Sequence, residues 1–149
     1  MSDLAPYASQ MTLGGPPECP TRPFCQPGLE KTYGLKFKSF KPLDSGGPLS
    51  KNALANGDVD VALIFSSDGA VSARNFVILE DDKHLQDADN VVPVIRTPKL
   101  TSGITEVWNS ISSKLTTADL VAMNKSADID KEDPTALADK WLRDHGYTK

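Results

Sequence analysis

Arg22 lies in a proline-rich stretch between two cysteines, and its side chain is the strongest candidate for binding chemistry in the sequence. A guanidinium group presents a rigid fork of donors that pairs with a carboxylate through two hydrogen bonds. Pro23 directly after it is typical of a helix start, where backbone N–H groups also favour an anion. From these residues alone Arg22 is a candidate for binding an anion, and the alternative is a surface arginine without a ligand.

Cys19 and Cys25 flank this arginine closely. Two cysteines at this spacing could close a small disulfide ring, which would indicate an oxidising compartment, and two unpaired thiols are the alternative. Two thiolates supply half of a tetrahedral zinc shell, and His84 and His145 lie far away in the sequence, so we expect no metal site. No partner base is visible for a catalytic thiol, and we expect a protein that is not an enzyme.

Phe65 ends the apolar segment Val59–Phe65, which is rich in β-branched residues and is typical of a buried strand. Binding clefts of α/β sheets open where the strands end, so this position is a candidate for ligand contact. A phenylalanine of the core is the alternative.

The first half of the chain alternates short helix-like and strand-like pieces, the pattern of a small α/β unit. Glycines and prolines between these pieces give sharp stops. We expect helices over Asp3–Ser9, Pro27–Tyr33 and Leu49–Ala55, and strands over Met11–Leu13, Lys36–Phe40, Val59–Phe65, Phe76–Leu79 and Val91–Ile95.

The last third of the chain has apolar residues at helical spacing, which predicts three helices. The first has one apolar stripe and the second starts near Thr116. The third begins at Asp133-Pro134 and stops at Gly146, as helix caps predict. The stripe of the first helix consists of Ile104, Val107, Trp108, Ile111 and Leu115, and we expect Trp108 and Trp141 in the core.

Composition sets limits on the partners of this 149-residue chain, which is 39% hydrophobic and 24% charged. The formal net charge is −4 and the basic residues are scattered, which argues against nucleic acid as a partner. The start Met1-Ser2-Asp3 has neither a basic nor an apolar region, so we expect no signal peptide. The sequence then belongs to the cytosol or to a longer precursor, and the cysteine pair favours the precursor.

Short motifs spread along most of the sequence carry a resemblance to a known family. In order and spacing, the chain resembles the osmoprotectant-binding proteins of ABC importers, the glycine betaine, choline and carnitine type with a type II periplasmic-binding-protein fold. The motifs include Gly14-Gly15-Pro16-Pro17-Glu18, Thr21-Arg22-Pro23, Tyr33-Gly34-Leu35, Lys41-Pro42-Leu43-Asp44, Gly46-Gly47-Pro48-Leu49, Gly57-Asp58-Val59-Asp60-Val61-Ala62-Leu63, Ser66-Ser67-Asp68-Gly69 and Leu79-Glu80-Asp81-Asp82-Lys83.

The resemblance implies an α/β fold: lobe two of such a protein, followed by the C-terminal helices of lobe one, with the N-terminal part of lobe one missing. We therefore expect residues 1–75 to form a partial ligand-binding lobe two and residues 76–96 to form hinge-proximal strands. Residues 97–149 would be helices that pack on lobe one.

The resemblance also assigns roles to side chains. Arg22 would hold the carboxylate of the ligand, and Phe65 would form one aromatic wall around a trimethylammonium group. Cation–π attraction of this kind contributes about 0.5–2 kcal/mol per ring. Asp89 falls where the family often has a second aromatic wall, and a carboxylate there favours a cationic ligand over a zwitterion. A solvated loop acid is the alternative for Asp89.

The function implied is that of the substrate-binding component of an importer for quaternary-ammonium osmoprotectants such as glycine betaine or choline. It implies an extracytoplasmic location, periplasmic or lipid-anchored, an ABC permease as partner and no cofactor. The alternatives are a structural or engineered fragment that binds no osmolyte, forming a swapped homodimer, and the receptor domain of a fused permease.

Overall fold

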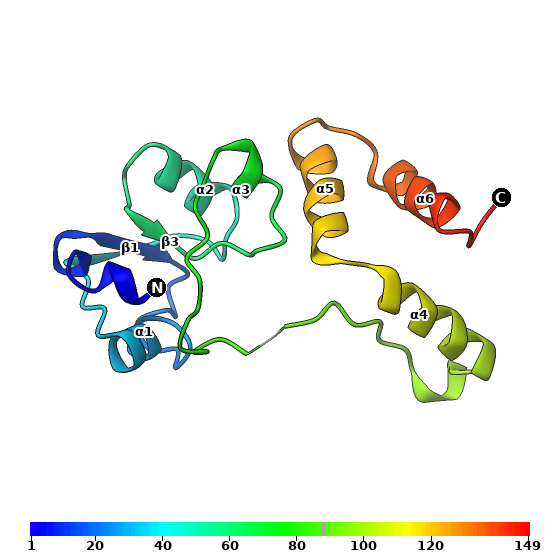
Figure 1. Ribbon diagram of the computed structural model, residues 1–149, viewed down its shortest axis with the longest axis horizontal. Coiled ribbons are helices and arrows are strands. Elements are labelled where there is room, and N and C mark those ends of the chain that lie inside the picture. Colours follow the sequence, from blue (N-terminus) through cyan, green and yellow to red (C-terminus); the bar gives the residue numbers. More distant parts are fainter. Residues whose placement is uncertain (88) are drawn as a thin grey trace.

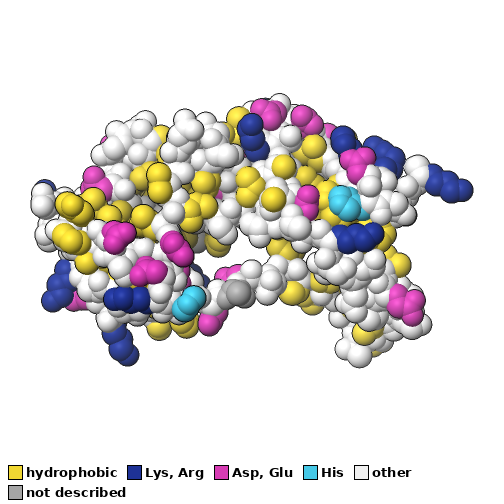
Figure 2. Space-filling model, viewed as in Figure 1, with side chains coloured by type: hydrophobic (Ala, Val, Ile, Leu, Met, Phe, Trp, Pro, Cys, Tyr) yellow, Lys and Arg dark blue, Asp and Glu magenta, His cyan; other side chains and the backbone are white. Residues whose placement is uncertain are grey.

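The computed structural model describes residues 1–87 and 89–149 and divides into an α/β unit and three C-terminal helices (Figure 1). Residues 76–101, which we call the strap, run between these two parts, and their described portion contains no strand. Figure 2 shows an opening between the strap and the two parts that it joins.

The α/β unit is built on three short parallel strands in the order β2-β1-β3. Leu13 of the central strand β1 lies opposite Phe40 of β2 and Val61 of β3. The predicted strand Lys36–Phe40 begins later than expected, and Val59–Phe65 is reduced to the residues that pair with β1. The bounds are Thr12–Gly15 for β1, Ser39–Pro42 for β2 and Val61–Ala62 for β3.

Two of the three expected N-terminal helices form close to their predicted bounds: α1 (Gln26–Tyr33) and α2 (Pro48–Ala55). Helix α1 ends at Gly34, whose φ of 71° is left-handed, a conformation that glycine adopts without steric cost. A short helix α3 (Ala70–Ala73) was not predicted.

The expected helix Asp3–Ser9 is absent and is replaced by two 3-10 turns, Ser2–Leu4 and Ala8–Gln10. Pro6 explains the difference, because proline has no N–H to bond the carbonyl one turn earlier.

The core of the α/β unit joins β1 to the loop that follows it. Leu13, Cys19 and Cys25 form a buried cluster against which Leu29 and Leu63 pack. Cys19 and Cys25 form the expected disulfide, with a Cα–Cα distance of 5.2 Å. The cysteines therefore fix the loop that contains Arg22 to the hydrophobic core.

The strap lacks the two strands predicted at Phe76–Leu79 and Val91–Ile95. A strand needs a neighbour that satisfies its backbone groups, and none of the described residues pairs with these segments. Their apolar side chains instead face solvent, and Val77 and Val94 are 84% and 88% exposed. The prediction of two strands in this segment is therefore wrong.

Three helices follow the strap: α4 (Ser102–Lys114), α5 (Thr117–Asp128) and α6 (Pro134–Asp144). We call them the helical arm. The side chains of Thr101, Thr116 and Asp133 cap their N-termini, which explains why the sequence predicted the starts well.

None of the residues in these three fully described helices is fully buried. Trp108 and Trp141, expected in the core, are half-buried. Trp141 stacks on His145, the C-cap residue of α6, with ring centroids 3.9 Å apart. The arm therefore retains an apolar face with few partners in the described chain.

Candidate ligand-binding site

The carboxyl ends of all three strands meet at one edge of the sheet, because the strands are parallel. The loop after β1 contains Arg22, the loop after β2 contains Asp44 and Gly47, and the loop after β3 contains Phe65. Ligands of α/β sheets bind at this edge. The topology thus brings the loops of Arg22 and Phe65 to the same side of the α/β unit.

The Arg22 loop is held by its own backbone and by the disulfide. The Arg22 N–H donates to the Glu18 carbonyl at 3.0 Å, and the Arg22 carbonyl accepts from the Cys25 N–H at 2.9 Å. Helix α1 begins only at Gln26, so the helix start expected at Pro23 is wrong. Pro23 lies instead in a turn within the ring that the disulfide closes.

The guanidinium of Arg22 is exposed and has no ion pair with any residue in the described ranges 1–87 and 89–149. A cation on an ordered loop without a carboxylate partner is available to bind one from solution. The loop geometry therefore supports an anion-binding role for this side chain, in the absence of the helix N-terminus that the sequence suggested.

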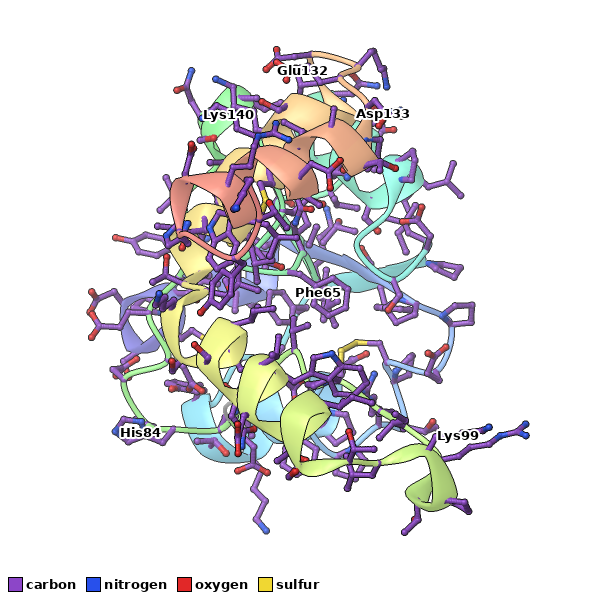
Figure 3. All side chains as sticks on the ribbon, turned by 90° about the vertical axis from the view of Figure 1, so that its right-hand side faces the viewer. Phe65, His84, Lys99, Glu132, Asp133 and Lys140 are labelled. Atoms are coloured by element: carbon purple, nitrogen blue, oxygen red, sulfur yellow. A yellow bond between two sulfur atoms is a disulfide. The ribbon has the colours of Figure 1, made fainter. Side chains whose placement is uncertain are left out.

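Phe65 is not a core residue: its side chain is 56% exposed. One edge of the ring lies against Gly46, where an added Cβ would come within 3.3 Å of Phe65 Cδ2. Gly46 also has a left-handed φ of 75°. A side chain at this position is therefore disfavoured both by the backbone conformation and by the close contact with the Phe65 ring. Figure 3 shows Phe65 near the centre of the molecule when it is viewed from the side of the helical arm.

The two loops share a hydrophobic support. Leu63, two residues before Phe65 in the sequence, packs on the cluster of Leu13, Cys19 and Cys25 that anchors the Arg22 loop. A displacement of the disulfide ring would therefore disturb the chain that leads into Phe65.

Asp89 lies on the strap and is exposed. The strap is tied to the Arg22 loop nearby, because the Gln86 side-chain amide donates to the Phe24 carbonyl at 2.6 Å. Asp89 is three residues further along, which allows at most about 10 Å of extended chain. Among the described residues, no hydrogen bond or ion pair links Asp89 to Arg22 or Phe65.

Phe24 is a candidate that the sequence analysis overlooked. Its side chain is 49% exposed, and it follows Arg22 by two positions in the ring closed by the disulfide. An aromatic residue beside an arginine in a constrained loop was the available signal. The sequence analysis considered only Arg22, Pro23 and the two cysteines in this segment.

Asp44 stabilises the loop that follows β2. Its carboxylate accepts from the backbone N–H groups of Leu49 and Ser50, both at 2.9 Å, at the start of α2. Burial acts to raise the pKa of Asp44, but hydrogen bonds from Ser50, Leu49 and Gly47 outweigh it and hold the pKa below its ordinary value. Asp44 is therefore a structural anion, and it leaves Arg22 unpaired.

The strap is anchored to α1 through Asp81. Its carboxylate accepts from the Tyr33 hydroxyl, from the Leu85 N–H at 3.0 Å and from the Gln86 N–H at 2.7 Å. Burial acts to raise the pKa of Asp81, but the hydrogen bonds from Tyr33, Gln86 and Leu85 outweigh it and hold the pKa below its ordinary value. Asp81 therefore holds this part of the strap in place against α1.

This anchor predicts an acid-dependent stability. A carboxyl group whose pKa is depressed by folding stabilises the native state above its unfolded pKa of about 4, and this contribution is lost as the pH falls. We expect Asp81→Asn to lower the free energy of unfolding at pH 7 and to flatten its decline between about pH 5 and pH 3. Urea unfolding at several pH values measures this, with Asp87→Asn on the same exposed segment as control. Parallel curves for wild type and Asp81→Asn would contradict it.

The described residues contain no group of three or more His, Cys, Asp or Glu side chains that could hold a metal ion. Helices long and apolar enough to cross a bilayer are likewise absent from the described part of the chain. A cavity of about 570 Å³ lies near the contact between α3 and α5, but Arg22, Phe65 and Asp89 do not line it.

The loops at the carboxyl edge of the parallel sheet thus present an exposed guanidinium, which has no ion pair among the described residues, and an exposed aromatic ring. A sequence profile of the substrate binding domain of ABC-type glycine betaine transport systems matches residues 1–144. The chain belongs to this family. The family consists of solute-binding domains rather than enzymes, which confirms the expectation that the chain is not an enzyme.

Individual relatives agree with this assignment. The carnitine transport binding protein OpuCC of Listeria monocytogenes is 30% identical over 125 residues, which are 80% of this chain and 39% of the relative. The glycine-betaine-binding protein of Pseudomonas aeruginosa is 29% identical over 133 residues, 87% of this chain and 42% of the relative. The chain therefore spans less than half the length of these relatives.

A solved structure confirms the fold class. The crystal structure of a glycine betaine/carnitine/choline ABC transporter matches with a TM-score of 0.78 and 27% identity. The match covers 99% of this chain and 54% of that chain. The α/β architecture and the resemblance to part of a periplasmic binding protein are thus both confirmed. The α/β unit and the helical arm together match about half of that protein.

Proposed function

We propose that the chain is a fragment of the substrate-binding component of an ABC importer for quaternary-ammonium osmoprotectants such as glycine betaine or choline. The observation that carries the proposal is that neighbouring carboxyl-edge loops hold an exposed Arg22 without an ion pair among the described residues and an exposed Phe65. Such a pair recognises a molecule with a carboxylate at one end and a methylated ammonium at the other.

Glycine betaine and carnitine have both of these ends, whereas choline has only the ammonium. Arg22 therefore favours the first two, and Phe65 serves all three. Asp89 adds Coulomb attraction for the cationic end from the strap, which reduces the preference for a zwitterion. The ligand class is thus quaternary ammonium compounds, with the carboxylate as the feature that Arg22 selects.

The exposed strap supports the division of the chain proposed from the sequence. Residues 1–75 form the partial lobe two, residues 76–96 lie at the hinge, and residues 97–149 pack on lobe one. Val77, Val91, Val92 and Val94 are all more than half exposed, and contiguous exposed apolar residues mark an interaction surface. Strands of lobe one would pair with these segments and would cover the apolar face of the arm.

The cellular setting follows from the same proposal. The disulfide between Cys19 and Cys25 fits an oxidising, extracytoplasmic compartment. The partner is an ABC permease, which receives the ligand-loaded receptor, and binding needs no cofactor. A homodimer of this chain, in which a second copy covers the strap, is the competing arrangement, and light scattering after size exclusion separates a dimer from a monomer.

Isothermal titration calorimetry tests the proposed ligand class. We expect measurable binding of glycine betaine, carnitine and choline. We expect a lower affinity for 3,3-dimethylbutanol, the neutral carbon isostere of choline. Phe65→Leu should weaken choline binding by about threefold to thirtyfold and bring the two affinities closer together, because leucine keeps apolar volume but loses the ring face. Tyr7→Leu, an exposed aromatic on another loop, is the control. No heat with any of the three quaternary ammonium compounds would overturn the proposal.

A further inference from the structure

The loop that follows Phe65 is fixed to the α/β unit by a largely shielded ion pair. Lys51 of α2 lies 2.7 Å from the Asp68 carboxylate, and their side chains are only 14% and 12% exposed. The other carboxylate oxygen of Asp68 accepts from the Ala70 N–H at 2.8 Å, and the Asp68 N–H donates to the Phe65 carbonyl at 3.0 Å. Phe65 is therefore connected rigidly to the start of α3.

The same loop is also the contact surface for the helical arm. The side-chain amide of Asn124 on α5 donates to the Ser67 carbonyl at 2.8 Å. Gly69 packs so closely on α5 that an added Cβ would lie 2.4 Å from the backbone N and Cα of Lys125. Val121 of α5 borders the adjacent cavity together with Val71 of α3, and Figure 2 shows hydrophobic side chains exposed where the two parts meet.

The loop therefore has a ligand-facing ring at one end and the arm at the other. We infer that Asn124 is a positioning residue that couples the helical arm to the ligand contact of Phe65 through the Ser67 carbonyl. This rests on the proposed function, since it concerns how the same site responds to ligand. Because coupling free energies are reciprocal, ligand at Phe65 stabilises the docked arm as much as the docked arm favours ligand.

Asn124→Asp tests the inference, because aspartate has the same shape but donates no hydrogen bond from its side chain. We expect choline affinity to fall about fivefold, the effect of one lost hydrogen bond. Hydrogen exchange supplies a second readout that a merely structural role would not move. Choline should slow amide exchange in α5 of the wild type and leave it unchanged in Asn124→Asp.

The control is Asn109→Asp, which makes the same chemical change on an exposed position of α4. Gly69→Ala is a second disrupting variant, because its methyl group must displace α5, and it should abolish the α5 response in the same way. The inference is overturned if Asn124→Asp binds choline as wild type does, or if its α5 amides still respond to the ligand. A wild type that binds no quaternary ammonium compound overturns the proposed function itself, whereas binding without an α5 response overturns only the coupling.

Discussion

Replacing both cysteines by alanine is expected to lower the free energy of unfolding by about 2–4 kcal/mol, the typical contribution of a disulfide. Cys19 is fully buried, and the pair belongs to the cluster with Leu13 that attaches the Arg22 loop to β1. Loss of the bond increases the conformational entropy of the unfolded chain, and it also weakens the packing of this cluster in the folded state. Chemical unfolding of the wild type and of the double variant Cys19→Ala, Cys25→Ala measures the difference.

Reduction of the wild type provides a matched control, because it breaks the bond while it keeps the sulfur atoms in the core. We expect reduction to account for most of the loss in the double variant. The affinity for glycine betaine should fall in the reduced wild type and in the double variant, since Arg22 lies within the ring that the bond closes. Equal stability of oxidised and reduced protein would contradict this role of the disulfide.

Substitution of Arg22 by alanine is expected to weaken glycine betaine and carnitine binding by about tenfold to hundredfold, the effect of losing a charge-assisted hydrogen-bond pair. Choline has no carboxylate, so its affinity should change by less than about twofold. The ratio of glycine betaine to choline affinity, measured by calorimetry, isolates the guanidinium from general damage to the fold.

Arg22→Lys is the informative companion, because lysine keeps the charge but lacks the planar fork. We expect it to recover only part of the glycine betaine affinity. If Arg22→Ala weakens choline as much as glycine betaine, the arginine does not act on the carboxylate, and the assigned role is wrong.

The sequence predicted those parts of the fold that depend on local interactions. Caps at Thr116 and Asp133 and the left-handed Gly34 set helix ends through neighbouring residues, and these ends were found. The strands expected at Phe76–Leu79 and Val91–Ile95 depend on a distant partner that the described chain does not supply. Strand pairing of these segments was therefore not predictable from local sequence alone.

The local structure around the candidate site residues was only partly predictable from the sequence. Phe65 was placed at a strand end, but its exposure depends on how Gly46 meets the ring, which no local pattern reveals. Arg22 was expected at a helix start, whereas the disulfide ring delays α1 to Gln26. The contact of Asn124 with Ser67 joins residues 57 positions apart and could not be read from spacing.

The position of the ligand's methyl groups tests the account most directly. Nuclear Overhauser effects between the methyl protons of bound glycine betaine and the ring protons of Phe65 are expected, with the ring assigned by comparison with Phe65→Leu. Methyl contacts to Phe76, in the cavity beside α3 and α5, with none to Phe65, would contradict the proposed site at the carboxyl edge of the sheet.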